Sequence, residues 1–158
     1  MSLEEARVIV VVYTAVLLPL IIYFFNKSKI PSWVPSFYII AVIVCALGWE
    51  IWFTFGWLDG DPVDIRRSAA LNTWLPKNIN WLMNSMGDAG AVLLGGFWLM
   101  WLTHNKDNLV FLEWKWSAFI VLLAWCIGQN ILVEMFLYHD QLAEGKPLSW
   151  APLSPLGP

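Results

Sequence analysis

The sequence VIVVVYTAVLLPLIIYFF, from Val8 to Phe25, decides the fold class because it contains no charged or amide side chain. A helix rises about 1.5 Å per residue, so this stretch is just long enough to cross the roughly 30 Å hydrocarbon core of a bilayer. The leader before this stretch, from Ser2 to Arg7, is acidic rather than basic. No small-x-small cleavage site follows the apolar stretch. These features favour a retained membrane-spanning helix over a signal peptide.

Three further apolar stretches lie downstream and predict three more spans: Phe37 to Leu58, Ile79 to Thr103, and Trp116 to Tyr138. Short connections after the first and third spans predict antiparallel neighbours. The longer connection, 59–78, begins with the turn sequence Asp-Gly-Asp-Pro, and its middle is expected to form a short interfacial helix. We therefore predict an all-α polytopic membrane protein, a bundle of four transmembrane helices, over residues 1–144. The proline-rich tail, 145–158, is expected to be extended and to lie at the membrane interface.

The composition supports a multi-pass integral membrane protein. Hydrophobic residues make up 59% of the 158 residues and charged residues only 13%, about half of the roughly 25% that is usual in soluble domains. The net charge of -3 and the absence of a basic run argue against a nucleic-acid partner. Cys45 and Cys126 lie in apolar stretches and are expected to pack as small apolar residues. The composition leaves open which membrane holds the protein.

Polar side chains interrupt three of the predicted spans at a similar depth. At a rise of about 1.5 Å per residue, Glu50, Asp88 and Asn130 each lie roughly 12–14 Å from the membrane face that carries the long loop. Asn84 and Glu134 lie one turn nearer that face. Residues spaced by four share one side of a helix, which aligns Asn84 with Asp88 and Asn130 with Glu134. The sequence thus predicts a polar cluster inside the bundle.

Two alternatives explain the predicted cluster. An Asp at a helix centre costs roughly 2.5–3.5 kcal/mol on insertion scales, so the acids must face inward. They can act as interhelical hydrogen bonds, worth typically about 0.6 kcal/mol each. They can instead line a cavity in which one carboxyl holds a proton and the other is an anion, an arrangement suited to acid–base catalysis. The candidate catalytic residues are Glu50 and Asp88. The candidate ligand-binding residues are Trp49, Asn84, Trp98, Trp125, Gln129, Asn130 and Glu134.

Metal and cofactor chemistry has little support in the sequence. His104 and His139 lie at or beyond the ends of predicted spans, so haem ligation by a buried histidine is not expected. The sequence has no Cys/His ligand cluster and no glycine-rich phosphate loop. We therefore expect no metal and no cofactor.

The polar residues resemble a pattern of the EXPERA superfamily, which contains the emopamil-binding proteins and sigma-2-type receptors. The residues are Glu50, Asp88 and the segment 126–134, CIGQNILVE, whose Gly-Gln pair looks like the family's. The resemblance covers about Phe37 to Tyr138. It implies a lipid-facing cavity in which carboxylates and tryptophans handle a sterol-like ligand by proton shuttling. Two departures bear on the isomerase activity: Ala46 stands where the family has a histidine, and a proline-rich tail replaces a further helix.

Two functions follow as hypotheses. The first is an integral membrane protein whose acidic and amide cavity binds a sterol- or lipid-like ligand and acts in an isomerase-like way. The second is a non-catalytic accessory subunit of a larger membrane complex, in which the polar cluster holds helices together and the tail docks on a partner. The expected partners are a membrane lipid or a small hydrophobic ligand in the first case, and other membrane subunits in the second. Whether the protein is an enzyme stays open at this point.

Overall fold

A computed structural model of the chain describes residues 1–28, 30–55, 57–58, 61–62 and 68–136. The described part is all-helical, with five helices and one small β-hairpin. Three helices are long and apolar enough to cross a membrane: Glu5–Asn26, Lys77–Thr103 and Trp116–Val133. The predicted interfacial tail, 145–158, lies outside the described residues.

The first predicted span is confirmed as helix α1, Leu3–Asn26. Its N-terminus is closed by a capping box, in which the Glu5 backbone N–H donates to the Ser2 hydroxyl at 3.1 Å. The Ser2 backbone N–H in turn donates to the Glu5 carboxylate at 2.7 Å. This reciprocal pair satisfies N–H groups that the first turn of any helix leaves without intrahelical partners.

The second predicted span is a continuous helix made of three segments: α2 (Val34–Cys45), the π-helix η1 (Ala46–Glu50) and α3 (Ile51–Phe55). The predicted end at Leu58 is wrong, because Trp57–Leu58 forms strand β1 instead. It pairs antiparallel with β2, Asp61–Pro62, with Trp57 opposite Pro62. The apolar run therefore leaves the helix three residues before its predicted end, because Trp57 and Leu58 pair with a strand instead.

The long loop contains the expected short helix, α5 (Ala69–Trp74), whose first turn is capped by the Ser68 hydroxyl. The third span is again one continuous helix with a π-helical middle: α6 (Lys77–Gly87), η2 (Asp88–Leu94) and α7 (Gly95–Thr103). A short 3₁₀-helix, η3 (Asn108–Phe111), precedes α8 (Trp116–Phe136).

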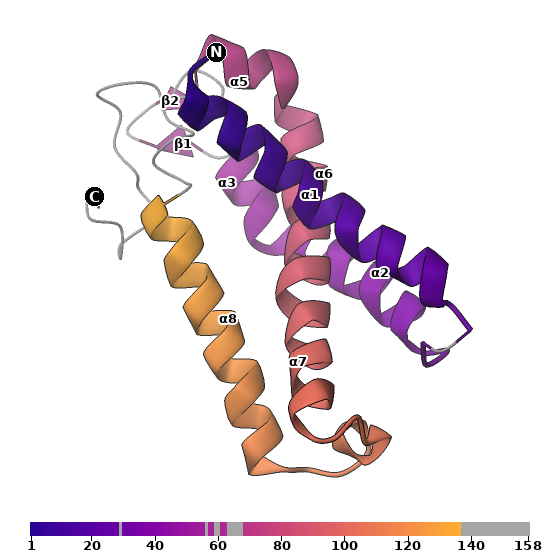
Figure 1. The fold of residues 1–158 in the computed structure, drawn as a ribbon. Coiled ribbons are helices and arrows are strands. Elements are labelled where there is room, and N and C mark those ends of the chain that lie inside the picture. Colours follow the sequence, from indigo (N-terminus) through magenta and orange to yellow (C-terminus); the bar gives the residue numbers. More distant parts are fainter. Residues whose placement is uncertain (29, 56, 59–60, 63–67, 137–158) are drawn as a thin grey trace.

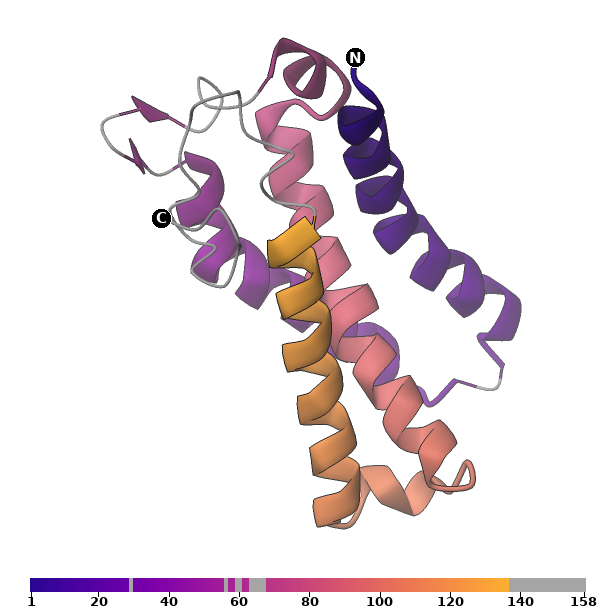
Figure 2. The ribbon, with the colours of Figure 1, turned by 60° about the vertical axis from the view of Figure 1, so that its left-hand side comes forward.

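The helix Lys77–Thr103 lies at the centre of the molecule. Helix α1 packs on α6 and η2, the α2–η1–α3 helix packs along α6 and η2, and α8 packs mainly on α7. Figures 1 and 2 show α1 and α8 on opposite sides of this central helix. The N-terminus, α5 and the hairpin lie at one end of the bundle, which we call the loop end, and η3 lies at the other (Figure 1).

Two glycines allow the helices to approach closely. A Cβ at Gly90 would lie 3.1 Å from Cγ of Pro19 on α1. A Cβ at Gly96 would lie 2.6 Å from Cδ1 of Leu122 and 3.1 Å from Cδ1 of Trp125, both on α8. The central helix therefore contacts both of its outer neighbours through positions without side chains, as is common between membrane helices.

Candidate functional site in the helical bundle

The two acids predicted as catalytic lie at the ends of the two π-helical segments. Glu50 is the last residue of η1, and Asp88 is the first residue of η2. Single-turn π-segments inside α-helices are rare and are frequent at functional sites. Here each π-segment lies directly beside an intramembrane acid.

Tryptophans from neighbouring helices bond to the carbonyls of both π-segments. The Trp81 indole N–H on α6 donates to the Ala46 carbonyl of η1 at 2.9 Å. The Trp125 indole N–H on α8 donates to the Val92 carbonyl of η2 at 2.9 Å. A carbonyl oxygen has two lone pairs, so these indoles satisfy acceptor capacity that the helical backbone bonds leave unused.

The acid cluster itself joins two helices. The Trp49 indole N–H donates to Oδ2 of Asp88 at 2.8 Å. The Glu50 side chain is only 3% exposed and interacts with the Asn84 side chain and with the Asp88 carboxyl, both on the neighbouring helix. The structure thus brings together four of the residues selected from the sequence: Trp49, Glu50, Asn84 and Asp88. We call these four the acid cluster.

The acid cluster has one exposed side, formed by Trp49. The Trp49 side chain is 44% exposed, whereas Glu50 next to it is buried. Cys45, one turn before Trp49, is buried near both acids. The exposed Trp49 ring thus lies beside one buried carboxyl, Glu50, and one partly buried carboxyl, Asp88.

Other residues selected from the sequence lie outside the acid cluster. Trp98 is 57% exposed on α7, and Asn130 is exposed on α8. Trp125 bonds to η2 backbone rather than to a carboxyl, and the Gln129 amide donates to the Cys126 carbonyl of its own helix at 3.2 Å. The common depth of Asn130 and the acids does not produce contact, because α8 packs mainly on α7. The Glu134 side chain is outside the described part of the structure.

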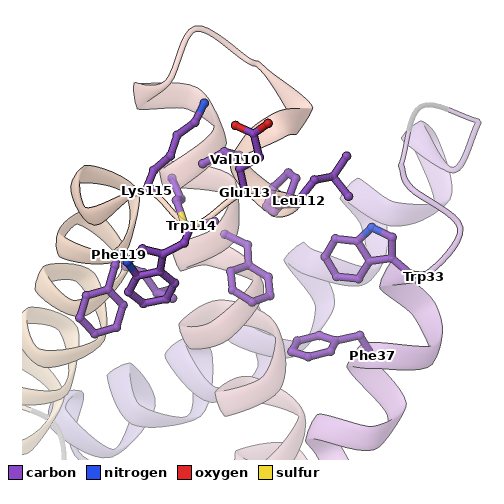
Figure 3. Close-up of a pocket in the computed structure, with 13 residues that line it drawn as sticks. Trp33, Phe37, Val110, Leu112, Glu113, Trp114, Lys115 and Phe119 are labelled. Carbon is purple, nitrogen blue, oxygen red and sulfur yellow. The ribbon is translucent and has the colours of Figure 1, made fainter.

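A second feature, missed from the sequence, is an aromatic pocket of about 450 Å³ at the end of the bundle opposite the loop end (Figure 3). Its aromatic rings contact each other in pairs. Trp33 and Phe111 meet edge-on with centroids 5.7 Å apart, and Phe37 and Phe97 are tilted with centroids 5.4 Å apart. Glu113 and Lys115 are the charged residues of its lining. The spacing of Trp33 and Phe37 by four residues is the signal in the sequence that points to this pocket.

The chemistry of the cluster is that of oxygen acids and indole donors. Among the described residues, no three His, Cys, Asp or Glu side chains gather in a way that could hold a metal ion. Comparison with known proteins finds no matching family model, no similar curated protein and no similar solved structure. The EXPERA resemblance therefore stays a hypothesis that rests on the residues quoted for it.

Proposed function

We propose that this chain is a four-span integral membrane protein whose acid cluster binds a hydrophobic, sterol- or lipid-like ligand and transfers protons to and from it. The observation that carries the proposal is the pairing of buried Glu50 with Asp88 across two helices, with the Trp49 indole hydrogen-bonded to Asp88 and the Asn84 side chain beside Glu50. Placing two carboxyls inside the bundle costs several kcal/mol, and pairing between helices needs only amides. A chemical role explains acids at both positions.

Of the four proposed spans, the second in chain order is the continuous helix from Val34 to Phe55. At about 1.5 Å per residue this helix is roughly 33 Å long, enough to cross the hydrocarbon core. In a variant without Cys45 and Cys126, single cysteines at Ser28 and Lys106 should react with an impermeant maleimide from one side of the membrane. Cysteines at Arg66 and Lys146 should react from the other. Reaction of the Ser28 and Arg66 positions from the same side would contradict four spans.

The two acids can perform an isomerase-like reaction without any external oxidant. Glu50 as the acid would give its proton to one carbon of a carbon–carbon double bond, forming a C–H bond and leaving a cation on the other carbon. Asp88, held by the Trp49 indole, would remove a proton from the next carbon beyond the cation, and the electrons of that C–H bond would form the new double bond to the cationic carbon. Glu50 must then regain a proton and Asp88 must lose one before the next turnover. The double bond moves, and the cluster as a whole neither gains nor loses a proton.

The experiment that tests this proposal replaces each acid by its amide. Glu50→Gln and Asp88→Asn keep the shape and hydrogen bonding of the side chains but remove the exchangeable acid. With a photoreactive cholesterol analogue as probe, we expect at least a tenfold loss of labelling and unchanged folding in both variants. Glu113→Gln, an exposed carboxyl far from the cluster, is the matched control and should label normally. Normal labelling of all three variants would contradict the proposal.

A second function, an accessory subunit of a larger membrane complex, is favoured by one observation on α8. Ala124 and Gly128 are exposed and spaced by four on one face of α8, and Asn130 is exposed on another face of the same helix. Small residues at this spacing let two membrane helices approach closely, and an amide in hydrocarbon needs a hydrogen-bonding neighbour. Gly128→Leu should release co-purifying membrane subunits if this function holds, and it should leave sterol-probe labelling unchanged.

A further inference from the structure

We infer that a hydrated file of polar side chains (Thr54, Asn80 and Asn84) connects Glu50 to the loop end of the bundle and admits water and protons to the acid cluster from that side. The inference rests on the proposed function, since a proton-transferring pair that exchanges protons with water needs a route to it. It assigns a role to Thr54 and Asn80, which lie outside the acid cluster.

The file is built by matching turns of two facing helices. Thr54 follows Glu50 by four residues on one helix, and Asn80 precedes Asn84 by four on the other, so each pair shares a helix face. The helix segments that carry them, α3 with α6 and η1 with α6, pack against each other. Thr54 is 3% exposed and Asn80 is 7% exposed, so both lie between the helices rather than in lipid.

The Asn80 side chain supplies the evidence for water in the file. Its side-chain oxygen Oδ1 is buried and has no hydrogen-bond partner in the part of the chain that the structure describes. A buried acceptor without a donor costs about 1–3 kcal/mol, and such groups in proteins are usually satisfied by an ordered water. A water on Oδ1 needs further polar partners, and the neighbouring side chains of the file, Thr54 and Asn84, supply the appropriate groups.

The file opens toward the loop end and is closed on the other side. Asn80 lies three residues after the first residue of α6, a rise of about 4.5 Å, so water at that face is close. The Lys77 ammonium lies 5.7 Å from the Phe55 ring centroid at the entrance. Beyond Asp88, the central helix from Ala89 to Leu102 offers no polar side chain except the indoles of tryptophan. On the facing helix, the Tyr38 hydroxyl donates to the Met86 carbonyl and is already engaged. The file therefore provides the proton route to the cluster from the loop end.

The test measures which membrane side controls the protonation of Glu50. N,N′-dicyclohexylcarbodiimide reacts with protonated carboxyls inside membranes, and mass spectrometry of peptides locates the product. The protein would be reconstituted into vesicles selected for an outward-facing N-terminal tag, and the pH would be changed on one side at a time. The titratable groups that face Glu50 are Asp88 on η2 and Cys45 on its own helix, with Lys77 at the entrance, so modification of each is recorded.

We expect Glu50 modification to follow the pH on the side of Lys77 and to ignore the other side. Asn80→Leu should slow the response to a pH jump at least tenfold, whereas Asn80→Ser, which still binds water, should respond nearly normally. Asn78→Leu is the matched control, an exposed asparagine changed to the same residue on the same helix. Thermal unfolding confirms that each variant is folded.

The inference is overturned if Glu50 modification follows the opposite side or neither side, or if Asn80→Leu responds as fast as Asn78→Leu. Should Asn80→Leu fail to fold, the comparison between sides in the unaltered protein and the response of Asn80→Ser still decide. The readout needs no ligand. The two hypotheses can fail separately. If Glu50 modification shows no one-sided pH response but Glu50→Gln still lowers sterol-probe labelling, this inference is rejected and the proposed function stands.

Discussion

The two halves of the central helix, Lys77–Thr103, make different kinds of contact with neighbouring helices. Its first half faces another helix with amides and an acid, and its side chains pair individually: Asn84 with Glu50, and Asp88 with Trp49. Its second half faces aromatic rings around a pocket, where Phe97 contacts Phe37, Trp33 and Phe111 through ring edges and faces. A hydrogen bond requires one particular partner group, whereas contacts between rings mainly fill space.

The backbones of the two halves also differ, one being irregular and the other regular. The polar half ends in the π-segment η2, whose carbonyls need the Trp125 indole, and the aromatic half is the regular helix α7. A π-segment shifts the side chains that follow it around the helix axis, because it adds a residue to one turn. The polar half thus combines an irregular backbone with specific partners, as functional sites often do.

The largest expected effects come from the two close glycine contacts, one in each half. Gly90→Ala places a methyl against the rigid Pro19 ring, and Gly96→Ala places one against Leu122 and Trp125. Each should lower the free energy of unfolding in mixed detergent by about 1–3 kcal/mol, the usual cost of overpacking. Gly48→Ala, where nothing lies within 4 Å, is the control and should change stability by less than about 1 kcal/mol. Equal effects at all three would refute the close packing.

A smaller effect should distinguish the specific pairing of the polar half. In a double-mutant cycle, Trp49→Phe and Asp88→Asn should show a coupling energy of about 0.6–1.7 kcal/mol, the range measured between membrane helices. The same Trp49→Phe change combined with Glu113→Gln should show none, because Glu113 lies at the other end of the bundle. Additive effects of Trp49→Phe and Asp88→Asn would remove the hydrogen bond from the acid cluster.

The smallest effect should come from the charged rim of the aromatic pocket. Lys115 lies 3.8 Å from Asp107, and the two side chains are 32% and 45% exposed. An ion pair this exposed contributes little, so Lys115→Met should change the free energy of unfolding by less than about 0.5 kcal/mol. Lys106→Met, an exposed lysine nearby, serves as the comparison. A loss above about 1 kcal/mol at Lys115 alone would show that the pocket depends on charge after all.

Much of the fold could be predicted from the sequence. Three of the four predicted spans coincide with helices long and apolar enough to cross a membrane. The exception ends at Phe55 rather than Leu58, because Trp57 and Leu58 pair with a strand that the hydrophobic pattern does not reveal. The π-segments could not be predicted from the sequence either, because a single widened turn does not change the pattern of hydrophobic residues.

The candidate site was predictable only in part. Helical spacing and depth were enough to bring Glu50 and Asp88 together, because buried acids need partners. The same depth argument failed to bring Asn130 to them, because depth along the membrane does not fix which side of a helix faces which neighbour. Trp98 shows the same limit: its position on α7 is deep, yet its side chain is exposed.

The sequence by itself predicted that hydrocarbon surrounds the chain, because 59% hydrophobic residues and 12 tryptophans are typical of a membrane protein of this length. It also determined the length of the helices and the identity of the residues that are costly in a membrane. Only the tertiary structure decided which helices touch. Helix α8 follows α7 and stays beside it, so its amides remain apart from the acids, whereas α2–η1–α3 lies against α6 and completes the acid cluster. Packing between helices depends on side-chain shape at each contact, such as Gly90 against Pro19, and composition does not contain that information.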